Sequence, residues 1–107
     1  NALSQDRHSW IGLVNTGGTN AHAMTFAVNA SGSAGAERLR IDGSGNVIVN
    51  TAAIATSATN GFLYVPTCSG TPTGTPTTYT GRAPIVIDAT NNKLYFYSGG
   101  AWRDAGP

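Results

Sequence analysis

Short apolar runs alternate with clusters of turn-forming residues along the chain, at a spacing of roughly 8–12 positions. Residues 10–14 form the first run, and residues 22–29 follow with Met24, Phe26 and Val28 on one face at a period of two. Because no segment shows the helical period or the capping residues of a helix, we predict an all-β fold built from short antiparallel hairpins.

Residues 37–50 predict a β-hairpin. Leu39 and Ile41 alternate with Arg38 and Arg40, so the two aliphatic side chains are expected to point inward and the two arginines outward. The Gly-Ser-Gly-Asn sequence that follows Asp42 is a turn, because glycine reaches positive φ at little energetic cost.

Residues 83–104 predict a three-stranded meander, with turns at an Asn-Asn pair and at a Gly-Gly pair. In its central strand Leu94 and Phe96 share one face, and Tyr95 and Tyr97 share the other. This meander is the strongest structural pattern in the sequence.

These patterns divide the chain into an N-terminal β segment (residues 1–50), a linker (residues 51–82) and a C-terminal β-meander (residues 83–107). Residues 50–60 fit either a short helix or an extended linker, and we favour the linker. Residues 61–65 predict a strand that Pro66 ends. The Thr-, Pro- and Gly-rich residues 67–78 predict an extended surface loop, with the character of a polyproline-like arm lying on a neighbour.

The composition leaves little material for a core. Gly, Ala, Thr, Ser and Asn make up 60 of the 107 residues, whereas Leu, Ile, Val and Phe together supply only 20. Cys68 is the single cysteine, so neither an intrachain disulfide nor a cysteine-based zinc cluster can compensate. Association of several chains is the usual remedy for so small a core, and we therefore expect an oligomer.

The charge and hydropathy of the sequence limit the kinds of partner that we expect. The formal net charge is +1, which gives no basic stripe for nucleic acid. No stretch approaches the roughly 20 apolar residues of a membrane helix, and we expect no membrane insertion. The chain begins at Asn1 rather than Met, from which we expect a processed product or part of a longer protein.

Candidates for catalysis are few. His8 and His22 are the only imidazoles, and Asp6 lies two positions before His8, but closeness in sequence does not make a triad. Asp42, Asp88 and Asp104 flank turns or strand ends, where carboxylates cap backbone N–H groups, with a calcium or hydrolytic role as the alternative. No carboxylate pair stands out for hydrolysis, so we expect no catalytic residues and no enzyme.

Metal and cofactor sites are also not expected. His22 lies on a predicted strand between two alanines, where three copies could in principle meet around a metal on a trimer axis. The chain lacks a His-x-His pair, however, and we predict neither a metal nor a cofactor. Cys68 is interpreted as a small packed residue, with a contact to a partner protein as the alternative.

The aromatic side chains are the best candidates for a binding surface. Aromatic rings with one polar edge favour subunit interfaces, and they can also stack on sugars. For these side chains we weigh packing in an interface, exposure to solvent, and binding of a receptor glycan. The predicted interface or receptor surface consists of Trp10, Tyr64, Tyr95, Tyr97 and Trp102, and Tyr79 is a further aromatic candidate.

Three segments resemble elements of tailed-bacteriophage fibre and virion structural proteins. Residues 81–102 resemble their closing segment, and residues 37–47, Glu-Arg-Leu-Arg-Ile-Asp-Gly-Ser-Gly-Asn-Val, resemble a second recurring element. Residues 61–74 look like the linker that joins the two. The resemblance implies a structural subunit of a phage fibre or spike, intertwined as a homotrimer and located on the virion, at the tail or the head surface. Residues 1–50 would then be a fibre-like β segment.

Two alternatives to the fibre subunit stay open. One is a capsid decoration or head-fibre protein, and the other is a tip module that binds a receptor glycan for host attachment. The implied partners are copies of the chain itself, other phage virion proteins and a host surface glycan. Hydrolysis of glycans is the weakest alternative.

Overall fold

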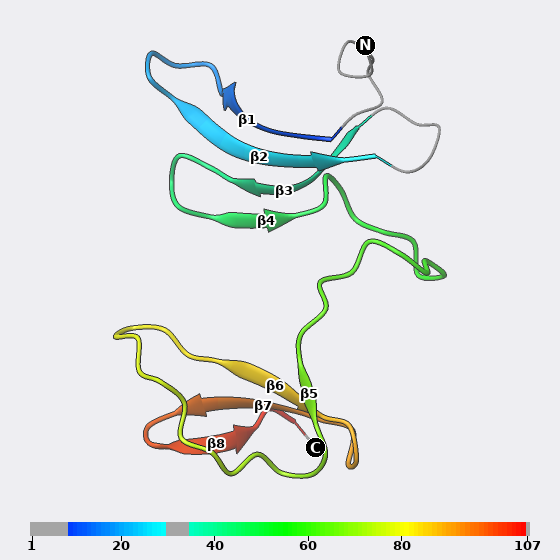
Figure 1. The fold of residues 1–107 in the computed structure, drawn as a ribbon, viewed down its shortest axis with the longest axis vertical. Helices are drawn as coiled ribbons and strands as arrows, with labels where there is room; N and C mark the ends of the chain where they lie inside the picture. Colours follow the sequence, from blue (N-terminus) through cyan, green and yellow to red (C-terminus); the bar gives the residue numbers. More distant parts are fainter. Residues whose placement is uncertain (1–8, 30–34, 107) are drawn as a thin grey trace. The chain divides into compact units, whose positions relative to one another are not determined.

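The computed structural model describes residues 9–29 and 35–106, and across these residues the chain is all-β, as predicted (Figure 1). The chain divides into two compact units, Asn1–Leu63 and Tyr64–Pro107. Each unit contains one four-stranded sheet. The boundary between the units lies within the segment that the sequence pattern assigned to a linker.

The first unit is an antiparallel meander in the order β1-β2-β3-β4. Its strands are β1 (Trp10–Asn15), β2 (His22–Val28), β3 (Ala36–Ile41) and β4 (Val47–Val49). The pairing of β3 with β4 confirms the hairpin predicted over residues 37–50. Asp42 closes its turn, because Oδ1 accepts the backbone N–H groups of Ser44 and Asn46, each at 2.9 Å.

The second unit has the order β5-β6-β7-β8. Its strands are β5 (Thr67–Cys68), β6 (Ile85–Asp88), β7 (Lys93–Ser98) and β8 (Ala101–Asp104). The antiparallel pairing of β6, β7 and β8 confirms the predicted C-terminal meander. Gly99 and Gly100 form its last turn with φ of 65° and 81°, the two positive values that a tight hairpin turn requires.

The strand predicted at residues 61–65 is wrong. The chain there carries no strand, and the short strand β5 begins after Pro66, parallel to β6. The Pro66 carbonyl accepts the Ile87 N–H at 3.1 Å, and the Cys68 carbonyl accepts the Ala89 N–H at 2.8 Å. The residues around Cys68 therefore pair with the free edge of β6. Residues 50–60 form bends and turns without a helix, in agreement with the favoured linker.

Asp88 joins the start of the long loop to the turn between β6 and β7. Its side chain is completely buried, and Oδ1 accepts the backbone N–H groups of Gly70 at 2.9 Å, Thr90 at 2.9 Å and Asn91 at 3.1 Å. Oδ2 accepts the Asn91 side-chain amide at 2.8 Å. The bond from the Asn91 side chain, supported by the backbone N–H groups, lowers the pKa of Asp88 although burial opposes this.

We call the hydrogen bonds that the Asp88 carboxylate accepts the Asp88 clasp. Replacement of Asp88 tests its contribution to stability. Asp88→Ala leaves three part-buried backbone N–H groups without their acceptor, so we expect the melting temperature of the full chain to fall by on the order of 5 °C or more. Asp88→Asn retains one acceptor oxygen and should lower it less. Equal losses in the two variants, measured by circular dichroism, would contradict the clasp.

The clasp also predicts a dependence on pH. Because the folded-state pKa of Asp88 lies below its unfolded value, its stabilisation is fully present above the ordinary carboxyl pKa and is lost as pH falls through the lowered pKa. We expect the melting temperature to decline on acidification below about pH 4 more steeply in the parent chain than in Asp88→Asn. Parallel curves for the two proteins would show that Asp88 does not contribute.

Candidate self-association surfaces

The register of the first sheet places its large apolar side chains on one face. Directly paired residues of antiparallel strands lie on the same face, and Ile11 pairs with Phe26 while Leu13 pairs with Met24. The pairing continues through β3 into β4. The resulting open apolar face consists of nine residues: Ile11, Leu13, Met24, Phe26, Val28, Leu39, Ile41, Val47 and Val49.

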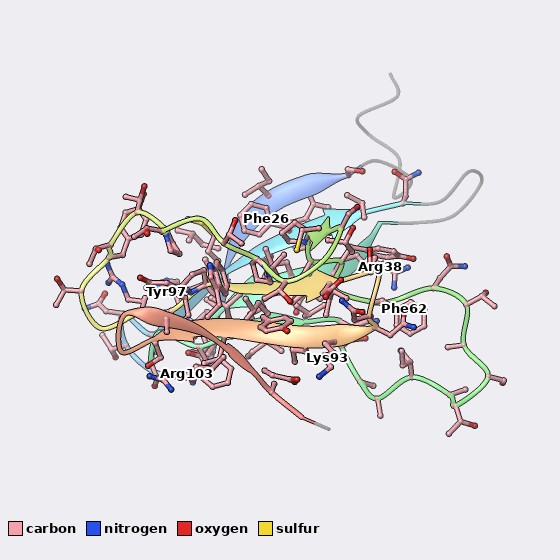
Figure 2. All side chains as sticks on the ribbon, turned by 90° about the horizontal axis from the view of Figure 1, so that it is seen from below. Phe26, Arg38, Phe62, Lys93, Tyr97 and Arg103 are labelled. Carbon is pink, nitrogen blue, oxygen red and sulfur yellow. The ribbon has the colours of Figure 1, made fainter. Side chains whose placement is uncertain are left out.

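Most of this open apolar face is accessible to solvent in the single chain. Phe26 and Leu39 are half-buried, and the other seven members are exposed. Figure 2 shows the side chains on the ribbon, with Phe26 labelled. A contiguous exposed apolar surface of this kind marks a place where another surface binds.

The opposite face of the same sheet has small residues in β2 that the chain itself covers, while Ile48 on β4 stays exposed on this face. Ala23, Thr25 and Ala27 of β2 are almost completely buried. The Trp10 ring lies over Gly12, where a Cβ would approach it to 3.2 Å. The small side chains of this face leave room for larger neighbours to lie across it.

An ion pair also lies on this covered face. Glu37 and Arg40 form a bidentate pair, with N–O distances of 2.8 and 2.9 Å. Residues three apart in a regular strand point to opposite faces, but the register shift opposite Phe26 and Ala27 adds a residue to β3. Both side chains therefore reach the face of Ala27 and Thr25, with which they pair.

The expected direction of the alternation is therefore wrong for Leu39, Ile41 and Arg40, whereas Arg38 is exposed as expected. Leu39 and Ile41 do alternate with Arg40, but within the chain they lie on the open face, whereas Arg40 lies on the covered one. Met24 and Val28 also lie on the open face, because they alternate with the buried residues of β2. The small residues of β2 are buried on the face where Trp10 and the ion pair lie.

The second sheet shows the same division. On one face Tyr95 is only 8% exposed, because the loop between β5 and β6 lies over it. Trp102 Nε1 donates to the Gly74 carbonyl at 2.7 Å, and the hydroxyl groups of Thr71 and Tyr95 are 3.4 Å apart. The arm that was expected to lie on a neighbour thus packs on its own sheet.

The other face of the second sheet is apolar and partly open. Ile85 pairs with Phe96 and Ile87 pairs with Leu94, so the four side chains share it. Ile85 and Leu94 are exposed, and Ile87 and Phe96 are half-buried. Each unit therefore has one face covered by its own chain and one face that exposes large apolar side chains.

The predicted aromatic surface is divided by the fold. Tyr95, Tyr97 and Trp102 come together on the loop-covered face, where the Tyr97 and Trp102 rings meet edge to face with centroids 5.3 Å apart. Trp10 lies on the covered face of the first sheet, and Tyr64 is exposed at the start of the second unit. The sequence analysis identified the aromatic residues but did not predict the open apolar face. The period-two pattern of apolar residues in consecutive strands could have indicated it.

The candidate metal ligands do not gather into a cluster in the described ranges. Residues 9–29 and 35–106 contain no group of three or more His, Cys, Asp and Glu side chains that could hold a metal ion. The Cys68 thiol donates to the Gly70 carbonyl at 3.3 Å. Asp6 and His8 lie outside the described residues. Within the part of the chain that is described, no helix is long and apolar enough to cross a membrane.

Comparisons with known proteins add no relative. A scan against models of protein families, a search of curated proteins and a search of solved structures each returned no match. The function proposed below consequently rests on the two open faces and on the sequence patterns of residues 37–104.

The bond between Trp102 and Gly74 gives a prediction about the loop. Trp102→Phe keeps a ring beside Tyr97 but removes the donor, at a cost of about 1 kcal/mol. We expect lower heteronuclear NOE values at residues 71–75. Trp10→Phe in the other unit is the control and should leave these values unchanged; unchanged values in Trp102→Phe itself would contradict the anchoring role.

Proposed function

We propose that the chain is a self-associating structural subunit of a bacteriophage fibre or spike, assembled as a homotrimer. The open apolar face of the first sheet is the observation that supports this proposal most directly. Covering a Leu, Ile, Val or Phe side chain contributes roughly 1.5–3 kcal/mol. Ala23, Ala27 and Tyr95 are the apolar residues buried among those described, so most of the available stabilisation lies in surfaces that the single chain leaves open.

Further copies of the chain are the partners that the composition favours. Closed symmetric assemblies are the common form of soluble oligomers, and identical chains bring identical apolar faces to a shared core. Three chains that share one core would compensate for the 20 large apolar residues of each. The role is mechanical: strands packed between chains give a stiff rod or knob that resists proteases.

The fibre assignment is supported by the likeness of residues 37–47 and 81–102 to phage fibre elements. The same trimer would also serve as a capsid decoration or head-fibre protein, with other virion proteins as its neighbours. Immunogold micrographs of the particle distinguish these two places. Label at the tail supports a tail fibre or spike, and label on the capsid supports the head alternative.

Two leucines provide a matched test of self-association. Leu13 on the open apolar face is 68% exposed, and Leu63, outside both sheets, is 69% exposed. In an isolated chain aspartate should be tolerated equally at both positions. In the assembly Leu13→Asp places a charge in the shared core, and we expect it to weaken association by about 2 kcal/mol per chain or more, roughly 30-fold, whereas Leu63→Asp should not.

Sedimentation equilibrium measures the outcome directly. The parent chain and Leu63→Asp should sediment as three copies of the 10.9 kDa chain, and Leu13→Asp should dissociate on dilution. A parent chain that sediments as a folded monomer at micromolar concentration would contradict the proposal.

A second pair controls for damage to the sheet. Ile41, on the open face, is 38% exposed, and Ile48, on the opposite face, is 40% exposed. We expect Ile41→Gln to reduce the trimer fraction at a given concentration and Ile48→Gln to leave it near that of the parent chain. Equal behaviour of the two variants would show that the open face is not the interface.

A further inference from the structure

The loop before β6 holds an aromatic ring and a cation at the two ends of one tight turn. The Arg82 N–H donates to the Tyr79 carbonyl at 3.0 Å, and Gly81 between them has a φ of 79°. A positive φ at the third position is the requirement of a type II turn, which glycine meets without strain. The turn therefore fixes the backbone positions of Tyr79 and Arg82 relative to each other.

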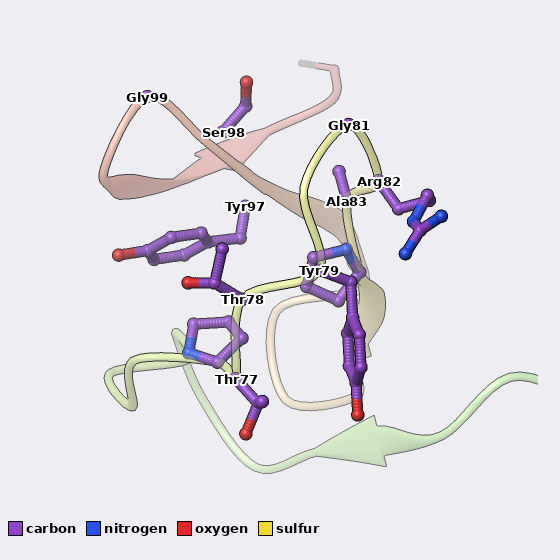
Figure 3. A pocket seen from close by; sticks show the side chains of 11 residues that line it. Thr77, Thr78, Tyr79, Gly81, Arg82, Ala83, Tyr97, Ser98 and Gly99 are labelled. Atoms are coloured by element: carbon purple, nitrogen blue, oxygen red, sulfur yellow. The ribbon is translucent and has the colours of Figure 1, made fainter.

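A hollow lies beside this turn. It has a volume of about 470 Å³ and is lined by Pro76, Thr77, Tyr79, Arg82, Ala83 and Pro84. A second hollow of about 380 Å³ shares these six residues and extends to Tyr97. In Figure 3 the Tyr79 ring and the Arg82 guanidinium lie on one side of the loop, and the Tyr97 ring lies on the other. These volumes are within the range of small-ligand sites.

The Arg82 side chain has no polar partner among the described residues, in contrast to the other cations of this unit. Lys93 pairs with Asp104 at 2.6 Å, and Arg103 Nε donates to the Ser98 carbonyl at 2.8 Å. The Arg82 guanidinium has no hydrogen bond or ion pair with any of the described residues. Tyr79 presents a ring that is 64% exposed. The turn thus displays a planar cation and an aromatic face together.

The loop that carries the turn is held at both sides. The Tyr97 N–H donates to the Pro84 carbonyl at 3.2 Å, and the Gly74 carbonyl accepts Trp102 Nε1 at 2.7 Å. Pro76 and Pro84 restrict the backbone between these anchors. A ligand that binds here finds a preformed surface, which reduces the ordering cost of binding.

We propose that this hollow binds an acidic saccharide, a sugar that carries a carboxylate. The guanidinium of Arg82 matches a carboxylate in a bidentate pair, and the Tyr79 ring offers a flat surface for the C–H face of a sugar ring. The Thr77 hydroxyl adds a donor and acceptor for sugar hydroxyl groups. The ring beside the cation favours a saccharide over an acidic peptide. The site adds a ligand to the proposed structural role and does not depend on the trimer.

Calorimetric titration of the full chain tests the site, with galacturonic acid hexasaccharide as the acidic probe and maltohexaose as the neutral one. We expect heat of binding with the acidic probe alone. Arg82→Gln and Tyr79→Ala should each weaken binding roughly tenfold or more, and Tyr79→Phe should bind as the parent does. The exposed Arg38 and Tyr64 supply matched controls, and Arg38→Gln and Tyr64→Ala should bind as the parent chain does.

Three results would overturn the inference: no binding of the acidic hexasaccharide, equal binding of maltohexaose, or unchanged binding by Arg82→Gln. Competition by a hexaglutamate peptide at equal concentration would overturn the saccharide class in favour of a peptide. Sedimentation of each variant is measured in parallel. A chain that forms trimers without binding the probe disproves this site alone, and a monomer that binds the probe disproves the proposed assembly alone.

Discussion

The packing of each sheet depends on one constraint: the chain covers only one of the two faces with its own residues. In the first unit, Trp10 and the Glu37–Arg40 ion pair cover one face. In the second unit, one face is covered by the loop that is hydrogen-bonded to Trp102 and Asp88. Each cover fits the face opposite the large aliphatic side chains. Both units consequently cover one face with their own residues, small ones in the first unit and aromatic ones in the second, and leave an apolar face open.

Hydrogen-bonded aspartates replace part of the missing apolar core. Asp42 holds the turn between β3 and β4, and Asp88 holds the turn between β6 and β7. The pKa of each is lowered, chiefly by a side-chain amide, from Asn46 in the first case and from Asn91 in the second. Turn geometry is therefore fixed by local polar contacts, so the open faces do not have to stabilise it.

This division of labour suits a structural role. Hydrogen-bonded aspartates and the loop hold each unit together. The aliphatic side chains can therefore be buried between chains, where burial stabilises an assembly most effectively. The ordered loop also separates two kinds of aromatic residue. Tyr95, Tyr97 and Trp102 are used for internal packing, whereas Tyr79 is displayed to solvent beside Arg82.

The sequence by itself determined most of the strands and three of the six strand pairings among the described residues. Period-two patterns and turn residues were sufficient for the hairpin at residues 37–50 and the meander at residues 83–104, because both depend on neighbours close in the chain. Only the tertiary structure decided that β5 follows Pro66 and pairs in parallel, since the partner edge belongs to a strand distant in sequence. It also decided which face is covered. Alternation separates Leu39 from Arg40, but Glu37 reaches the face of Arg40 only through a register shift that no periodicity encodes.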